Sequence, residues 1–123
     1  MGITSMTEPI SSDADNDFQV LFDAIQQAIH LNAKNKGFWD KPPEVGTSLM
    51  LIVSELGEAL EGFRAGNPMS EKIPPHLNTT EELADAVIRI LDFAGYHRLD
   101  LSGAILAKIK HNRSRPHKHG KEF

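Results

Sequence analysis

The sequence has no cysteine, and it has only one tryptophan and one tyrosine among its 123 residues. Without cysteine the chain cannot form disulfides, thiolate metal sites or a thiol nucleophile, so any metal or catalytic chemistry must use other side chains. The lack of disulfides agrees with the reducing cytoplasm, which is where we expect the protein to be.

Long hydrophobic runs are also missing. The longest strongly apolar run, Leu49–Val53, is far too short to span a membrane, and no basic segment leads into an apolar stretch near the N-terminus. No extended stretch alternates between polar and apolar residues, which disfavours a strand-rich fold. We therefore expect a soluble, helical protein without a membrane partner.

The charge is distributed unevenly along the chain. The formal net charge is -4, yet residues 108–121 are dense in lysine, arginine and histidine. Nucleic-acid-binding proteins usually have a broad positive face, whereas one basic segment in an acidic chain suits a compact anion such as a polyphosphate. The same segment can also be a solvated tail. The pattern disfavours nucleic acid as a partner and leaves these two interpretations open.

Apolar residues that recur every three or four positions predict one all-α domain over residues 17–123, after a polar, disordered lead over residues 1–16. Four helices are expected, at about residues 17–35, 43–65, 79–98 and 101–114. Gly37 and Gly66 supply stop signals, while Asp100 provides an N-cap for the last helix. Thr79 and Glu82 have the spacing of a capping box at the start of the third helix.

The second and third expected helices each carry a pair of carboxylates. Glu55 and Glu58, and likewise Glu82 and Asp85, are spaced i, i+3, which stacks two carboxylates on one side of a helix. Glu55 falls among apolar and small residues, where an ionised carboxylate is costly unless a cation or strong donors are near it. The alternative interpretation places both pairs on solvated helix faces.

The third expected helix is apolar around most of its circumference and is predicted to be largely buried. Its polar residues form one narrow stripe: Glu82, Asp85, Arg89, Asp92 and Tyr96. A binding site explains such a stripe better than exposure, although Asp85–Arg89 and Arg89–Asp92 surface ion pairs are an alternative. Ligands that are all oxygen favour a hard cation, Mg²⁺ or Mn²⁺, and the scattered histidines disfavour zinc.

The fourth expected helix provides candidate contacts for a phosphorylated ligand. Lys108 and Asn112 are spaced i, i+4 and share a helix face, so they could address a phosphate and a sugar hydroxyl or base edge. Arg115 and Lys118 follow closely and could reach the remaining negative charge.

The combined pattern resembles the MazG-type, all-α nucleoside triphosphate pyrophosphohydrolases over roughly residues 18–123. The pattern consists of Glu55-x-x-Glu58, then Glu82-x-x-Asp85, and then Lys108-x-x-x-Asn112. The resemblance implies a four-helix bundle-like fold that assembles as a homodimer or homotetramer, with sites at the subunit interfaces.

The resemblance also implies roles for individual residues. The four motif acids would bind Mg²⁺, Lys108 and Asn112 would contact the nucleotide, and Phe38 or Trp39 would help to form a base pocket. Many members have an additional acid adjoining the first pair, whereas here the next acid is Glu61. Glu58 and Glu61 are therefore both candidates for accepting the proton of the attacking water.

The predicted function is the Mg²⁺-dependent hydrolysis of a nucleoside triphosphate to its monophosphate and pyrophosphate, as in the house-cleaning of nucleotide pools. One alternative is a non-catalytic helical interaction module, which would show no magnesium dependence. A second alternative is a hydrolase of another pyrophosphate-containing metabolite, because acids and a basic tail address phosphates and not bases.

Overall fold

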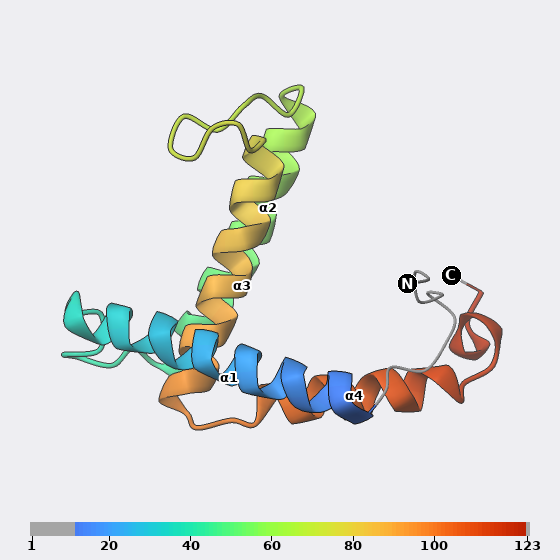
Figure 1. Ribbon diagram of the computed structural model, residues 1–123. Helices are drawn as coiled ribbons and strands as arrows, with labels where there is room; N and C mark the ends of the chain where they lie inside the picture. The colour runs from blue at the N-terminus through green and yellow to red at the C-terminus, as the bar shows by residue number, and fades with distance from the viewer. Residues whose placement is uncertain (1–11, 123) are drawn as a thin grey trace. The chain divides into compact units, whose positions relative to one another are not determined.

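The structure, a computed structural model, describes residues 12–122. These residues form four α-helices and one short 3₁₀-helix, and Figure 1 shows the arrangement of the α-helices within each part of the chain. The elements are α1 (Ser12–Asn35), α2 (Val45–Arg64), α3 (Asn78–Tyr96), α4 (Leu101–Arg113) and the 3₁₀-helix η1 (His117–Gly120). The described residues contain no strand, and their one isolated bridge joins Met69 to Leu77. The prediction of an all-α fold is confirmed.

Local signals end the helices where the sequence predicts. Gly37 and Gly66, which follow α1 and α2, have φ angles of 88° and 89°, a region that glycine adopts without strain. The Asp100 side chain accepts a hydrogen bond of 3.1 Å from the backbone N–H of Gly103 at the start of α4. The predicted N-cap of α4 is therefore confirmed.

The structure corrects the predicted start of the first helix. Helix α1 begins at Ser12, so residues 12–16 are helical and do not belong to a disordered lead. Asp13 and Asp15 lie in its first turn, where negative charge is favoured by the partial positive charge of the helix N-terminus. Residues 1–11, the rest of the predicted lead, lie outside the described residues.

The capping box predicted between Thr79 and Glu82 is wrong. Helix α3 begins at Asn78, and its N-cap residue, Leu77, makes no side-chain cap. The backbone N–H of Thr79 instead donates to Oδ1 of Asn67, at 3.0 Å. Because Asn67 satisfies this N–H from the preceding loop, the Glu82 side chain is not needed as a cap.

The described residues fall into two compact units. The central unit comprises Gln26–Leu99, which includes the end of α1 and all of α2 and α3. The terminal unit comprises residues 12–25 and 100–122, which include the start of α1 and all of α4. In the terminal unit the hydroxyl of the buried Ser102 donates to Oδ1 of Asp23 at 2.7 Å and so joins α4 to α1.

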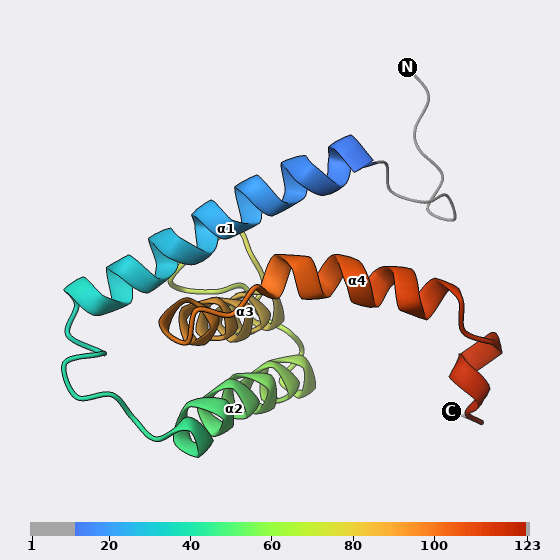
Figure 2. The same cartoon turned by 90° about the horizontal axis from the view of Figure 1, so that it is seen from below.

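Helices α2 and α3 pack side by side as an antiparallel pair in the central unit, as Figures 1 and 2 both show. The buried apolar residues on the two helices are Ala59, Ala86, Leu91 and Ala94. Three of the four are alanines, whose small side chains allow the two helix backbones to approach closely. The core of this pair is correspondingly thin.

The expectation that the third helix is largely buried is wrong for the single chain. Leu83, Val87 and Ile90 on α3 are 47%, 51% and 37% exposed. Large apolar residues of α2 are also exposed, among them Leu49, Met50, Leu51, Val53, Leu56, Leu60 and Phe63. The hydrophobic periodicity identified these residues as apolar, but the described residues of one chain leave them exposed.

Among residues 12–122, no helix is both long enough and apolar enough to cross a membrane.

Candidate functional site

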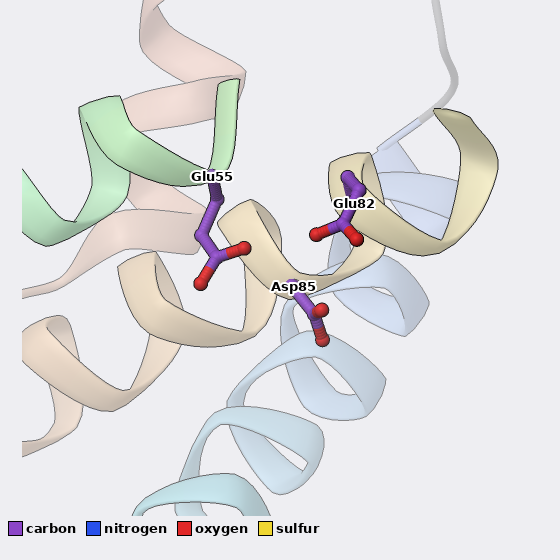
Figure 3. Close-up of side chains that lie close together, drawn as sticks. All are labelled: Glu55, Glu82 and Asp85. Carbon is purple, nitrogen blue, oxygen red and sulfur yellow. The ribbon is translucent and has the colours of Figure 1, made fainter. Parts of the chain in front are cut away.

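Three carboxylates from α2 and α3 converge in the central unit. Glu55, Glu82 and Asp85 each offer one oxygen atom, and these oxygens all lie within 4.8 Å of one another. Figure 3 shows Glu55 reaching from α2 toward the other two side chains, which come from α3. Carboxylates in this arrangement could hold a metal ion between them.

The placement of the cluster follows from the packing of the helix pair. Glu55 and Ala59 are the buried residues of α2, and their spacing of four places them on one face of the helix. Ala86, next to Asp85 in sequence, is buried on α3. The inward position of Glu55, predicted from its apolar and small neighbours, is confirmed.

Only one oxygen of the buried Glu55 carboxylate has a hydrogen-bond partner. Nε of Arg89 donates to Glu55 Oε1 at 2.8 Å, whereas Glu55 Oε2 is buried without a partner. Arg89 thus pairs across the two helices, and not with Asp85 or Asp92 on its own helix. A buried acceptor without a partner costs about 1–3 kcal/mol, a penalty that a cation beside Oε2 would remove.

The crowding of carboxylates shifts their pKa values in opposite directions. Burial, together with the nearby carboxylates of Glu58 and Glu55, raises the pKa of Glu82 from 4.5 to about 7. Burial and the neighbouring negative charges also raise the pKa of Asp85. Burial opposes ionisation of Glu55 as well, but the hydrogen bond from Arg89 and the charge of Arg89 help to outweigh burial and lower the pKa of Glu55. Without a cation, Glu55 is ionised and Glu82 retains a proton close to neutral pH.

The three carboxylates line a cavity of about 740 Å³ in the central unit. Its walls also include Glu58, the fourth motif acid, and the aromatic residues Phe38 and Trp39. Two cationic side chains, Lys72 and Arg89, line the same cavity. The volume lies within the range of small-molecule sites, about 300–1,000 Å³, so the cavity can accommodate a nucleotide-sized ligand.

Lys72 reaches the cavity from the loop between α2 and α3, and sequence reasoning missed it. The hydroxyl of the buried Ser70 accepts hydrogen bonds of 3.1 Å from the backbone N–H groups of Lys72 and Ile73, which folds the loop into a tight turn. Lys72 Nζ also lies 4.0 Å from Glu81 Oε1. No helical spacing marks this position, so no pattern in the sequence could have identified it.

Trp39 is held from two sides. Its ring stacks on Tyr96 with a centroid distance of 3.9 Å and an interplanar angle of 9°. Its Nε1–H donates to Asp92 Oδ1 at 2.9 Å, and His30 Nδ1 lies 2.8 Å from the same oxygen. The sequence marked Trp39 and the stripe position of Asp92, but it gave no sign of the contact with His30.

Phe38, the other aromatic candidate, and Glu61, the second candidate base, are both exposed. Phe38 lines the cavity but is 73% exposed. Glu61 does not line the cavity, and its exposed carboxylate lies 3.5 Å from Nη1 of Arg64 on the same helix. Of the two candidate bases, the structure places only Glu58 with the acid cluster.

The predicted nucleotide contacts from the basic end belong to the terminal unit. Lys108 and Asn112 lie one turn apart on α4 and are exposed. Arg115 Nη2 donates to the backbone oxygen of His119 at 3.5 Å, and Lys118 Nζ donates to that of Glu122 at 3.2 Å. Their contact with a nucleotide stays a prediction from the resemblance.

Comparison with known proteins gives no match: no protein-family model, curated protein or solved structure matches this chain. The site is therefore interpreted from its own residues. It combines an all-oxygen acid cluster, two cationic side chains and a fixed aromatic ring. These features suit a divalent metal ion and a phosphorylated ligand that has an aromatic part.

Proposed function

We propose that the chain is a magnesium-dependent nucleoside triphosphate pyrophosphohydrolase of the MazG type, acting on an NTP or dNTP. The observation that carries the proposal is the convergence of Glu55, Glu82 and Asp85 in a cavity that Trp39 also lines. In the proposed reaction a water oxygen bonds to the α-phosphorus and the bond from this phosphorus to the bridging oxygen breaks. The products are a nucleoside monophosphate and pyrophosphate.

The acid cluster fits a hard divalent cation. Its donors are all carboxylate oxygens, which Mg²⁺ and Mn²⁺ prefer. Oε2 of Glu55 is buried and has no hydrogen-bond partner among the described residues, as expected of an oxygen atom that binds a cation instead of a hydrogen-bond donor. Glu55, Glu58, Glu82 and Asp85 would hold the ion, which when bound supplies positive charge and Lewis acidity for the triphosphate oxygens.

The remaining chemistry is assigned to side chains of the same cavity. A carboxylate oxygen of Glu58 accepts the proton of the attacking water, because Glu58 lines the cavity and Glu61 does not. Arg89 and Lys72 are the lining cations and offset the negative charge of the triphosphate. Arg89 does so from a position already fixed by its hydrogen bond to Glu55.

The aromatic residues supply the binding surface for the base. Trp39 is fixed by Tyr96 and Asp92, so a base can stack on it without first ordering its ring. Phe38, the adjacent and more exposed ring, extends this surface. Lys108 and Asn112, with Arg115 and Lys118, keep the nucleotide-contacting role that the resemblance implies.

We also propose that the chain self-associates as a dimer or tetramer. Burying a large apolar side chain is worth about 1.5–3 kcal/mol, and Leu83, Val87 and Ile90 on α3 leave such surface open. A symmetric contact between two copies would cover equivalent residues of both chains at once.

Product identification tests the proposed reaction. The chain is incubated with each common NTP and dNTP plus Mg²⁺ in ¹⁸O-labelled water, and the products are separated and weighed by mass spectrometry. Monophosphate carrying the label, together with unlabelled pyrophosphate, supports attack at the α-phosphorus. Diphosphate with free phosphate contradicts it, and no magnesium-dependent turnover of any nucleotide favours the interaction module.

Substitutions then test the assignment of residues. Glu55→Gln, Glu82→Gln and Asp85→Asn should each lower kcat at least about 100-fold, because each removes a charged ligand without changing the shape of the side chain. Asp17→Asn, which removes an exposed acid of α1 outside the cavity, is the matched control. Activity that survived two of the three cluster substitutions would contradict the proposal.

A further inference from the structure

Asp92 lines the cavity but stands apart from the four motif acids, Glu55, Glu58, Glu82 and Asp85. Asp92 lies two turns beyond Asp85 on α3 and is bonded to Trp39 and His30. Both contacts use the same oxygen, Oδ1, at 2.9 Å and 2.8 Å. The second oxygen, Oδ2, takes part in neither, and the side chain is 21% exposed. Asp92 thus has one oxygen committed to the aromatic residues and one that can serve a ligand.

The chemistry of that second oxygen is one-sided. An ionised carboxylate accepts hydrogen bonds and cannot donate them, so it favours an N–H group and disfavours a carbonyl oxygen at the same place. Besides Trp39, the uncharged polar residues that line the cavity are Asn32 and Ser48, and both can donate and accept. Asp92 is therefore the lining residue beside Trp39 that can distinguish the two groups.

We propose that Asp92 is a specificity-determining residue that selects nucleobases with an exocyclic amino group over those with an oxo group in its place. The inference rests on the proposed function, in which the base stacks on Trp39. Because Asp92 also binds the Trp39 Nε1–H, the stacking surface and the hydrogen-bond acceptor are held in a fixed relation to each other. Acceptance from a base amino group is an established use of aspartate in reading base edges.

Matched pairs of substrates give the most direct test. CTP and UTP differ at the amino or oxo group of a pyrimidine, and ATP and ITP differ in the same way for a purine. In each pair the amino member should have a kcat/KM at least about 10-fold higher, since a mispaired polar group in a binding site is strongly disfavoured. Equal kcat/KM values within both pairs would overturn the inference, while the turnover itself would still support the proposed reaction.

The variant Asp92→Asn tests whether Asp92 is the cause. Its Oδ1 can still accept from Trp39 and His30, while its Nδ2 offers donors to the base. The preference should therefore fall to about 1 or reverse, whereas Asp17→Asn should keep the wild-type ratio. An unchanged ratio in Asp92→Asn would overturn the assignment. If circular dichroism shows that this variant does not fold, Asp92→Ser, whose hydroxyl both donates and accepts, must show the same loss of preference.

Binding without turnover separates this inference from the proposed reaction. Trp39 is the only tryptophan of the chain, so its fluorescence reports directly on a base stacked against it. Titration with CMP and UMP in the presence of Mg²⁺ should give a lower dissociation constant for CMP than for UMP. If no nucleotide is hydrolysed but this preference is found and disappears in Asp92→Asn, the reaction is wrong and the base selection stands. If neither monophosphate changes the fluorescence, the base-selection inference is wrong.

Discussion

Replacing Glu82 by glutamine should stabilise the metal-free protein at pH 8 and leave its stability nearly unchanged at pH 5. Glu82 has a pKa of about 7 in the folded chain and 4.5 as its ordinary value, so between these values the folded state binds more protons than the unfolded state. The free energy of unfolding therefore falls as pH rises from about 4.5 to about 7. Glutamine has nearly the same shape and never ionises, so it removes this loss.

The size of the effect follows from the same two pKa values. A difference of about 2.5 in pKa, at about 1.4 kcal/mol for each pKa unit, makes ionised Glu82 cost the metal-free fold about 3–4 kcal/mol. For a chain of this size that corresponds to roughly 10 °C in Tm at pH 8. The raised pKa of Asp85 acts in the same direction, whereas the lowered pKa of Glu55 stabilises the fold above pH 4.5, and this contribution is lost as pH falls below that value.

Urea denaturation in the presence of a chelator, at pH 5 and pH 8, measures the effect. Repeating it with Mg²⁺ should stabilise the wild type at pH 8 by more than the Glu82→Gln variant, because the variant has lost one charged ligand. Glu61→Gln is the matched control: its carboxylate is exposed and should contribute at most about 1 kcal/mol, equally at both pH values. A Glu82→Gln variant that is destabilised equally at pH 5 and pH 8 would refute the reasoning.

Three further predictions concern the central unit. In urea denaturation Arg89→Met should lower the free energy of unfolding by about 1–2 kcal/mol, and Mg²⁺ should restore the lost stability. The loss is smaller than for a fully buried ion pair because the Arg89 side chain is 44% exposed. Gly95→Ala should cost about 1–3 kcal/mol by the same measurement, because its Cβ would lie 2.7 Å from His30 Cβ, whereas Gly57→Ala, with nothing within 4 Å, should not destabilise. Val87→Glu should reduce the mass measured by light scattering to that of one chain, and a wild type that is already monomeric would contradict the proposed self-association.

The sequence predicted the helices well because their ends depend on local chemistry. Gly37, Gly66 and Asp100 each act within a few residues of the helix end that they mark. The start of α3 was misinterpreted because its partner is not local: Asn67 lies 12 residues before the Thr79 N–H that it accepts from. A capping box is visible in the sequence whether or not a more distant side chain takes its place.

The candidate site was also predictable only in part, because several of its contacts join residues that are far apart in the sequence. The spacing of Glu82 and Asp85 and the apolar neighbours of Glu55 indicated three side chains that the structure brings together. The partner of Glu55, Arg89, is 34 residues away, and the contact of His30 with Asp92 spans 62 residues. Such pairs depend on which helices pack together, and periodicity within one helix does not contain that information.

The acid cluster lowers the stability of the helix pair that contains it, and this cost indicates a functional role. A buried carboxylate oxygen on Glu55 lacks a partner, and ionisation of Glu82 is resisted up to about pH 7. Natural sequences seldom keep such conflicts within a small core unless function requires them. A single shared cation would resolve both, whereas a helical interaction module would gain nothing from burying acids beside the few alanines that hold α2 and α3 together. The conflict therefore favours a cation-dependent function over the interaction module.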